Sequence, residues 1–371
     1  MPVIVLFYQS NDMSMQDIFT LKAIYSFTLM FFEIPTGYLA DKLGRRTSIL
    51  IGSVLGVAGF LIYSFSFGFF EFVVAEIALG ISLSLVSGAD SAMLYDTLKA
   101  GNQSDKYTRI EGKISSAGNF AEALAGIIGG LIAVVSLRTP FYVQTFVAAL
   151  AIPAALILRE PEVVSQRLQT GFMQIPKIIK DSLHINKKLK WTILLSAAIG
   201  ASTLTMAWFV QPYFIMSGMA VAWFGVGWAV LNVAAGIGAY HAWRVELKVG
   251  SKSMVTLMVI MLASGFIAIS VVPFIPGFII LLVFYIFRGL ATPTLRNYIN
   301  QHTESEVRAT VMSLRNFIIR LIFAIVGPFF GWLTDVYSLQ TAFMIAGIFF
   351  GVISSITLFY FLKHSAFDAG K

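Results

Sequence analysis

Six charged side chains lie inside long apolar segments, where charge is rare. A charged residue at the centre of a membrane helix costs about 2.5–3.5 kcal/mol on insertion scales. Such groups normally face a cavity or one another, where they bind charged solutes or carry protons. They comprise three acids and three arginines: Glu33, Glu76, Glu122, Arg288, Arg315 and Arg320. Binding of charged solutes and transfer of protons require no covalent bond to the solute.

Among the acids, Glu122 is the first choice for a proton-carrying group, because it alone lies near the middle of its apolar segment. Glu33 is shallower, and we expect it to pair with Arg315. Glu76 lies nearer the outer surface. A salt bridge from Glu122 to Arg288 or Arg320 would hold it ionised and remove it from this role.

Small, polar and aromatic residues recur at helical spacing in several apolar segments and predict the lining of a solute path. Their alternative role is helix packing, which favours small and hydroxyl side chains in membranes. Both interpretations stay open for the serines. The candidates are Ser84, Ser87, Asn119, Thr203, Trp208, Gln211, Tyr285 and Thr292.

The sequence contains no pattern typical of an enzyme or a metalloprotein. It has no cysteine and four histidines, and no histidine pair has the spacing of a metal site. We find no phosphate-binding loop and no nucleophile motif. We therefore expect no catalytic residue, no metal and no cofactor.

Composition places most of the chain in a membrane. Of 371 residues, 57% are apolar and 12% are charged, whereas soluble domains carry about 25% charged residues. Met1 to Gln9 is too short to cross a bilayer and predicts the second half of a first helix, with a start further upstream. Eleven complete spans are expected at 18–40, 47–67, 72–94, 114–135, 140–158, 191–216, 222–243, 254–274, 277–296, 310–333 and 340–362.

The basic residues set the predicted orientation. Most of the 26 lysines and arginines fall in alternate loops, while the opposite loops hold only Arg138. The positive-inside rule then places the basic loops and the C-terminus in the cytoplasm. We therefore expect a multi-pass protein of the cytoplasmic (inner) membrane. This distribution also argues against nucleic acid as the reason for the net charge of +7.

One long polar stretch, 159–190, divides the chain. Its apolar residues recur at helical spacing and predict an interfacial helix in a cytoplasmic linker, with partner binding as the alternative. The flanking parts, 1–158 and 191–362, are expected to be related six-helix bundles, followed by a tail at 363–371. Glycine and tyrosine matches between the two halves support the repeat, for example Gly126 and Gly130 with Gly327 and Gly331.

The segment from Glu33 to Arg46 contains Gly37-Tyr38-Leu39-Ala40-Asp41-Lys42-Leu43-Gly44-Arg45-Arg46. It resembles the signature G-x-L-A-D-[KR]-x-G-R-[KR] between helices 2 and 3 of the major facilitator superfamily. Gly37 is expected to allow close helix packing, and Gly44 a turn that other residues resist. The resemblance implies a gating role for Gly37, Asp41, Lys42, Gly44, Arg45, Arg46 and Asp96.

The resemblance also implies an all-α fold of two pseudo-symmetric six-helix bundles, with twelve transmembrane helices of which the first is incomplete here. It implies a monomer in the lipid bilayer that moves a small molecule by alternating access, with protons as its partner and energy source. Two positions depart from family patterns. Glu76 replaces an arginine four residues before Gly80, and the drug-antiporter sequence at 126–130 lacks its proline.

Three functions remain open at this stage. The leading one is proton-coupled efflux of amphipathic compounds, which the 33 phenylalanines and 13 tyrosines favour. The alternative is uptake of a polar or anionic metabolite, whose charge Arg288 would bind. The third is a receptor or scaffold without transport activity.

Overall fold

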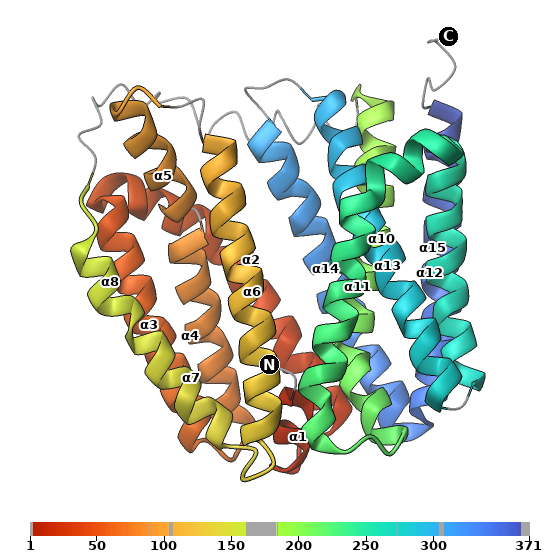
Figure 1. The fold of residues 1–371 in the computed structure, drawn as a ribbon, viewed down its shortest axis with the longest axis horizontal. Coiled ribbons are helices and arrows are strands. Elements are labelled where there is room, and N and C mark those ends of the chain that lie inside the picture. Colours follow the sequence, from red (N-terminus) through yellow and green to blue (C-terminus); the bar gives the residue numbers. More distant parts are fainter. Residues whose placement is uncertain are drawn as a thin grey trace. The chain divides into compact units, whose positions relative to one another are not determined.

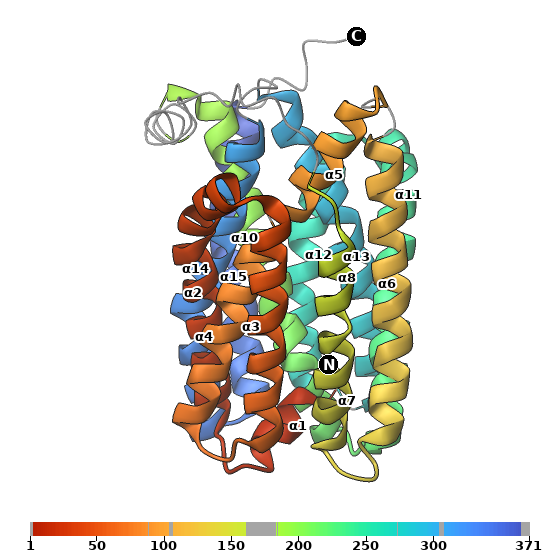
Figure 2. The same cartoon turned by 90° about the vertical axis from the view of Figure 1, so that its left-hand side faces the viewer.

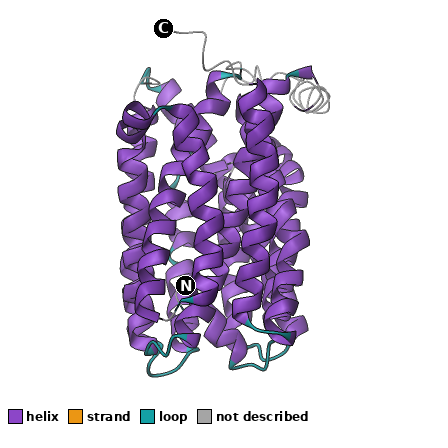
Figure 3. Ribbon diagram, turned by 90° about the vertical axis from the view of Figure 1, so that its right-hand side faces the viewer, coloured by secondary structure: helices purple, strands orange, loops and turns teal. Residues whose placement is uncertain are grey.

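The computed structural model describes residues 3–87, 89–103, 107–160, 183, 185–272, 274–303 and 308–364. Within these ranges every regular element is a helix, as the colouring in Figure 3 shows. The predicted all-α fold is thus confirmed. Most of the predicted linker, with its interfacial helix, lies outside the described residues, as does the tail after 364.

The chain divides into two compact units (Figure 1). The N-terminal unit is Met1–Arg167 with Ala220–Val226, and the C-terminal unit is Leu168–Met219 with Gly227–Lys371. The helices up to residue 160 are α1 (Ile4–Gln9), α2 (Met15–Leu43), α3 (Arg45–Phe65), α4 (Phe69–Ser87), α5 (Ala89–Ala100), α6 (Tyr107–Ile132), α7 (Thr139–Ala149) and α8 (Ala151–Ile157).

The later helices follow the predicted spans closely. They are α10 (Lys187–Met216), the short 3-10 helix η3 (Val221–Trp223), α11 (Phe224–Val249), α12 (Ser251–Val271), α13 (Phe274–Gln301), α14 (Arg308–Val336) and α15 (Leu339–His364). Each complete span predicted from the sequence coincides with one of these helices or with a consecutive pair. The incomplete first helix corresponds to α1.

Nine helical stretches of the described chain are long and apolar enough to cross a membrane. Glu33 lies on α2 and Glu122 on α6, whereas Glu76 lies on α4, one of these nine stretches.

Close helix packing in the N-terminal unit runs through glycines on α3. Helix α4 packs against both α2 and α3 (Figure 2). A Cβ placed on Gly59 would lie 2.7 Å from the Leu79 side chain, and one on Gly52 would lie 3.0 Å from the Ser82 carbonyl oxygen. Small residues at such positions let backbones approach, and this contact brings α4 against the middle of the unit.

In the C-terminal unit, α10 packs against α13, α14 and α15, and α12 packs against α13 and α15. Helix α13 also lies close to α11. A Cβ on Gly238 would lie 2.2 Å from the Ile286 carbonyl oxygen, and one on Gly289 would lie 1.9 Å from the Ala235 carbonyl oxygen. This double glycine contact fixes α13 at the level of Arg288.

Replacement of Gly289 by alanine is therefore expected to destabilise the folded protein. The added methyl group meets backbone, which cannot rotate away, and overpacking of this kind typically costs about 1–3 kcal/mol. Thermal melting of the purified protein in detergent measures the loss. Gly236→Ala on α11 is the matched control, since a Cβ there meets nothing within 4 Å. Equal melting temperatures for the two variants would contradict the contact.

Candidate functional site

The N-terminal unit contains a buried ion pair. The ammonium of Lys22 on α2 pairs with the carboxylate of Glu76 on α4, and the two residues are 7% and 1% exposed. The Tyr8 hydroxyl donates to Glu76 Oε1 at 2.7 Å, and the Tyr63 hydroxyl donates to the same oxygen. One carboxylate oxygen thus accepts from three donors on three other helices.

Aromatic rings seal this cluster. Phe72 on α4 meets the Tyr8 ring edge-on at 5.2 Å, and Phe141 on α7 stacks on Tyr63 at 5.4 Å. The Lys22 ammonium also lies 5.2 Å from the Tyr8 ring centroid, within cation–π range. Exclusion of water strengthens the pairing, and it makes the loss of either charged partner costly.

Sequence analysis singled out Glu76 but missed its partners. Lys22 was a recognisable signal, because it is a cation inside an apolar span and Glu76 is an acid inside another. The two tyrosines carried no such signal, since tyrosine is common in membrane helices. The departure from the family pattern at Glu76 therefore has a local explanation: the acid replaces an arginine and is balanced by Lys22.

A second candidate site lies on α13 in the C-terminal unit. The Arg288 guanidinium carbon is 5.0 Å from the Tyr285 ring centroid, and the Trp228 ring of α11 meets Tyr285 edge-on at 6.5 Å. Tyr285 is fully buried. Its hydroxyl and Arg288 Nη1 are both buried, and neither has a hydrogen-bond partner among the described residues.

The other two arginines lie on α14. Arg315 is 5% exposed and donates through Nε to Ser196 Oγ at 2.5 Å and through Nη1 to Asn316 Oδ1 at 3.0 Å. This ties α14 to α10. Arg320 is partly exposed. The expected pair between Glu33 and Arg315 stays a prediction.

Glu33 on α2 and Glu122 on α6 have exposed side chains, in contrast to Glu76. No hydrogen bond or ion pair joins Glu122 to another residue in the described part of the chain. Of the acids singled out in the sequence, Glu122 is thus the one that the structure leaves both accessible and unpaired.

In the signature segment, α2 ends at Leu43 and α3 begins at Arg45. Gly44 between them has φ +93°, which confirms the predicted glycine-dependent turn. The carboxylate of Glu160 accepts from the backbone N–H groups of Arg45 and Arg46, each at 2.8 Å. Glu160 was not recognised in the sequence, yet it caps the N-terminus of α3.

The second arginine of the signature segment forms a stabilising hydrogen bond, whereas the first glycine differs from the prediction. Arg46 Nη2 donates to the Leu156 carbonyl oxygen at 2.7 Å. The expectation that Gly37 permits close packing is wrong, because the residue is exposed and a Cβ there meets nothing within 4 Å. Lys42 is exposed. The side chains of Asp41 and Asp96 lie outside the described set.

Several candidate lining residues are instead used in packing. Ser84 is 5% exposed, and its hydroxyl lies 2.6 Å from that of Thr36, so it joins α4 to α2. This is the alternative role considered for the serines. Gln211 is 4% exposed, and the Thr203 hydroxyl donates to its own helix at Gly200.

The remaining candidates are more accessible. Ser87 and Thr292 are exposed, and Trp208 is half-buried. The Thr292 hydroxyl donates to the Arg288 carbonyl oxygen at 3.4 Å, one turn earlier in α13. The side chain of Asn119 lies outside the described set. Across the described chain, no cluster of three or more His, Asp or Glu side chains has the arrangement of a metal site.

Comparison with known proteins identifies the family. The sequence profile of the Major Facilitator Superfamily matches residues 1–322. The chain belongs to this superfamily. Superfamily members are transporters, so the predictions of a multi-pass membrane transporter and of its fold are confirmed.

Curated relatives of this superfamily member are distant. Quinolone resistance protein NorA of Staphylococcus aureus (strain MRSA252) is 23% identical over 214 residues, which cover 57% of the chain and 51% of the relative. The MFS-type transporter ppzB of Metarhizium rileyi is 31% identical over 115 residues, which cover 30% and 24%. The chain spans about half the length of the NorA proteins it matches.

Solved structures of superfamily members share the fold. The nucleoside transporter NupG has a TM-score of 0.75 at 14% identity and covers 96% of this chain and 92% of its own. A D-xylose-proton symporter has a TM-score of 0.76 at 14% identity and covers 100% and 93%. At these identities the likeness establishes the fold alone.

The 126–130 segment, which departs from the drug-antiporter sequence of the superfamily, has a structural role here. A Cβ on Gly225, at the start of α11, would lie 2.3 Å from the Gly126 carbonyl oxygen, and one on Gly130 would lie 2.9 Å from the Gly225 nitrogen. All three glycines belong to the N-terminal unit. The glycines of the 126–130 segment therefore allow close packing of α6 against the start of α11, although the segment lacks the proline of the drug-antiporter pattern.

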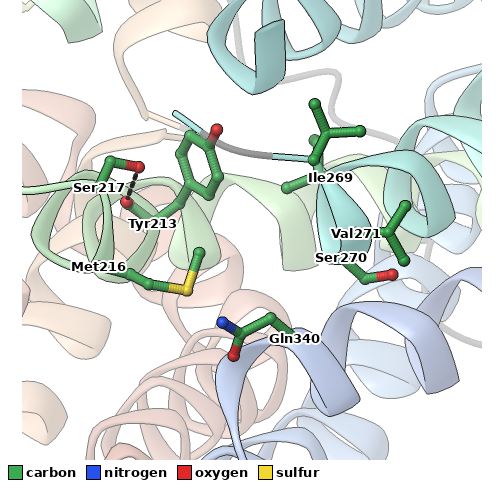
Figure 4. Close-up of a pocket in the computed structure, with 8 residues that line it drawn as sticks. Tyr213, Met216, Ser217, Ile269, Ser270, Val271 and Gln340 are labelled. Atoms are coloured by element: carbon green, nitrogen blue, oxygen red, sulfur yellow. Dashed lines mark hydrogen bonds between the residues drawn. The ribbon is translucent and has the colours of Figure 1, made fainter. Parts of the chain in front are cut away.

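The C-terminal unit of this superfamily member also has an open cavity of about 430 Å³ (Figure 4). Tyr213, Met216 and Ser217 line it from the end of α10, and Gln340 lines it from α15. The end of α12 closes the opposite wall through residues 269–271. Of the residues singled out in the sequence as site candidates, none lines this cavity.

Proposed function

We propose that the protein is a secondary active transporter that exports amphipathic compounds by alternating access, driven by protons. The relatedness to NorA supports this direction, since the name of that protein connects it with quinolone resistance. The aromatic content of the chain, with 33 phenylalanines and 13 tyrosines, suits contact with amphipathic solutes.

The observation that carries the proton coupling is the contrast between two acids. Glu76 is buried and its carboxylate is satisfied by Lys22 and two tyrosines. Glu122 is exposed and has no partner in the described chain. An accessible carboxylate on a membrane helix can take up and release a proton without breaking a buried network, so we assign the proton to Glu122.

A second candidate function is uptake of a polar or anionic metabolite. Arg288 favours it, because its buried Nη1 has no acceptor in the described residues and an anionic solute would supply one. In either case we propose that the protein acts as a monomer in the cytoplasmic (inner) membrane, with its C-terminus in the cytoplasm.

One experiment separates these functions. The purified protein is reconstituted in liposomes with an imposed pH gradient, and flux is measured for amphipathic dyes, aromatic acids, sugars and nucleosides. Gradient-driven movement of amphipathic compounds against the proton flow supports export. Movement of a polar metabolite together with protons supports uptake. Absence of flux for every class would favour the receptor or scaffold and contradict both.

Asp41 of the signature segment is expected to control the conformational equilibrium. We expect the Asp41 carboxylate to reach the positive N-terminus of another helix when the cytoplasmic gate closes, and such a contact contributes about 0.3–1 kcal/mol when exposed and up to ~2 kcal/mol when partly buried. Asp41→Asn should therefore lower the transport rate several-fold and raise labelling of cysteines introduced on the cytoplasmic side. Unchanged turnover with weaker solute binding would contradict the gating role.

A further inference from the structure

The helices of the C-terminal unit carry positive charge without acids at the same depth. In the described part of this unit the acids are Glu246 and Asp335, each in the last turn of its helix. Arg288, Arg315 and Arg320 lie in helix interiors. Charged groups inside membrane proteins are normally compensated by a partner of opposite charge. The described part of this unit has no acid in a helix interior that could compensate these arginines.

Arg288 and Arg315 differ in their contacts. Arg315 donates to the Ser196 hydroxyl and the Asn316 side chain. The Arg288 guanidinium carbon lies 5.0 Å from the Tyr285 ring centroid, and no ion pair joins Arg288 to an acid of the described chain. A cation–π contact leaves the N–H groups of the guanidinium free to donate, because it uses the charge and not the hydrogens.

Two buried polar groups therefore lie next to each other without an acidic partner in the described chain. Tyr285 and Arg288 are three residues apart on α13 and share one face of the helix. The Tyr285 hydroxyl and Arg288 Nη1 are both buried and unpartnered among the described residues. Native proteins rarely leave buried donors unsatisfied, so such groups call for a partner, whether water, an ion or a ligand.

The surroundings of these donors are rigid and aromatic. The glycine contacts of Gly238 and Gly289 hold α13 against α11 on either side of Arg288. Trp228 of α11 lies edge-on to Tyr285, and Phe284 lies 6.4 Å from the same ring. Arg288 and Tyr285 are thus held in place next to aromatic side chains.

We propose that Arg288 and Tyr285 bind the carboxylate of an amphipathic organic acid. The guanidinium and the phenol each donate to one carboxylate oxygen, and the apolar part of the solute packs toward Trp228. This inference rests on the proposed function and narrows it, because it makes the solute an anion. A cationic amphiphile would be repelled by Arg288, and a neutral one would leave the guanidinium uncompensated.

Binding to the purified full chain in detergent at pH 7 tests the inference independently of flux. Thermal stabilisation is titrated with benzoate, 2-naphthoate and indole-3-acetate, and with the neutral amide of each acid. We expect the acids to act at concentrations at least about tenfold lower than the amides, as a charge-assisted hydrogen bond implies. Arg288→Gln should abolish this preference, and Tyr285→Phe, which removes only the hydroxyl, should reduce it.

Arg296→Gln is the matched control, because Arg296 is an exposed arginine two turns further along the same helix. It should keep the wild-type preference for acids. Arg288→Lys retains the charge without the planar fork and is expected to keep part of the preference, so it reports on the site if the glutamine variant does not fold.

Equal responses to acids and amides in the wild type, or a preference that survives in Arg288→Gln, would overturn the inference. So would a loss of preference in Arg296→Gln equal to that in Arg288→Gln. Proton-driven flux of cationic or neutral dyes without acid preference would leave the proposed transport intact and refute only the acid site. Acid binding without any proton-driven flux would leave the acid site intact and refute the proposed transport.

Discussion

Replacement of Lys22 by methionine is expected to destabilise the folded protein by about 3–5 kcal/mol, because it leaves the Glu76 carboxylate buried without its cation. Glu76→Gln should cost less, since the amide oxygen still accepts from Tyr8 and Tyr63 while the lysine loses its counter-ion. Thermal melting in detergent, with the fraction that remains monodisperse after heating, measures both losses.

The combined variant is the decisive comparison. Lys22→Met with Glu76→Gln removes both charges and keeps an acceptor for the tyrosine hydroxyls, so it should be more stable than Lys22→Met alone. Lys42→Met is the control, since Lys42 is an exposed lysine on the same helix and should change stability within about 0.5 kcal/mol. Additive losses in the double variant would refute a coupled pair.

Glu122→Gln is expected to abolish transport that is driven by a pH gradient. The amide has nearly the shape of the acid but cannot exchange a proton, so only the coupling should be lost. Flux is measured in proteoliposomes with and without an imposed gradient, with the solute that the wild type moves best. We expect gradient-driven accumulation to fall to the level of protein-free liposomes.

Exchange of labelled for unlabelled solute at equal pH is the internal control for this variant. It needs binding and conformational change but no net proton movement, so it should continue at a rate close to that of the wild type. Loss of exchange together with accumulation would point to a binding or structural residue. Gradient-driven transport at the wild-type level would remove Glu122 from the mechanism.

The helical spans could be predicted because their signal is local and strong. An apolar stretch of about 20 residues has one stable form in lipid, a helix with internally satisfied backbone groups. Helix α12, predicted at 254–274, is found at Ser251–Val271. The differences lie at the ends, where polar residues continue a helix into the interface. Helix α13 runs to Gln301, beyond the expected end at 296.

The contacts between helices could not be predicted in the same way. Charges inside apolar spans identified Glu76 and Arg288 as unusual, since their cost does not depend on neighbours. Whether such a charge is paired depends on helix rotation and packing, which hydrophobicity leaves open. Lys22 was therefore overlooked as the partner of Glu76. Gly37 was misjudged for the same reason, because a glycine has no side chain to indicate what its helix faces.

The capping of α3 by Glu160 affects when the first basic turn can reach its final shape during synthesis. Its carboxylate reaches the N–H of Arg45 across 115 positions of sequence, so the first basic turn is synthesised long before its cap exists. Until α8 has entered the membrane, those amides can be satisfied only by water or lipid headgroups. We therefore expect the turn to reach its final shape late in translation, after insertion of the sixth span. A nascent chain arrested before Glu160 should remain open to proteases at Gly44.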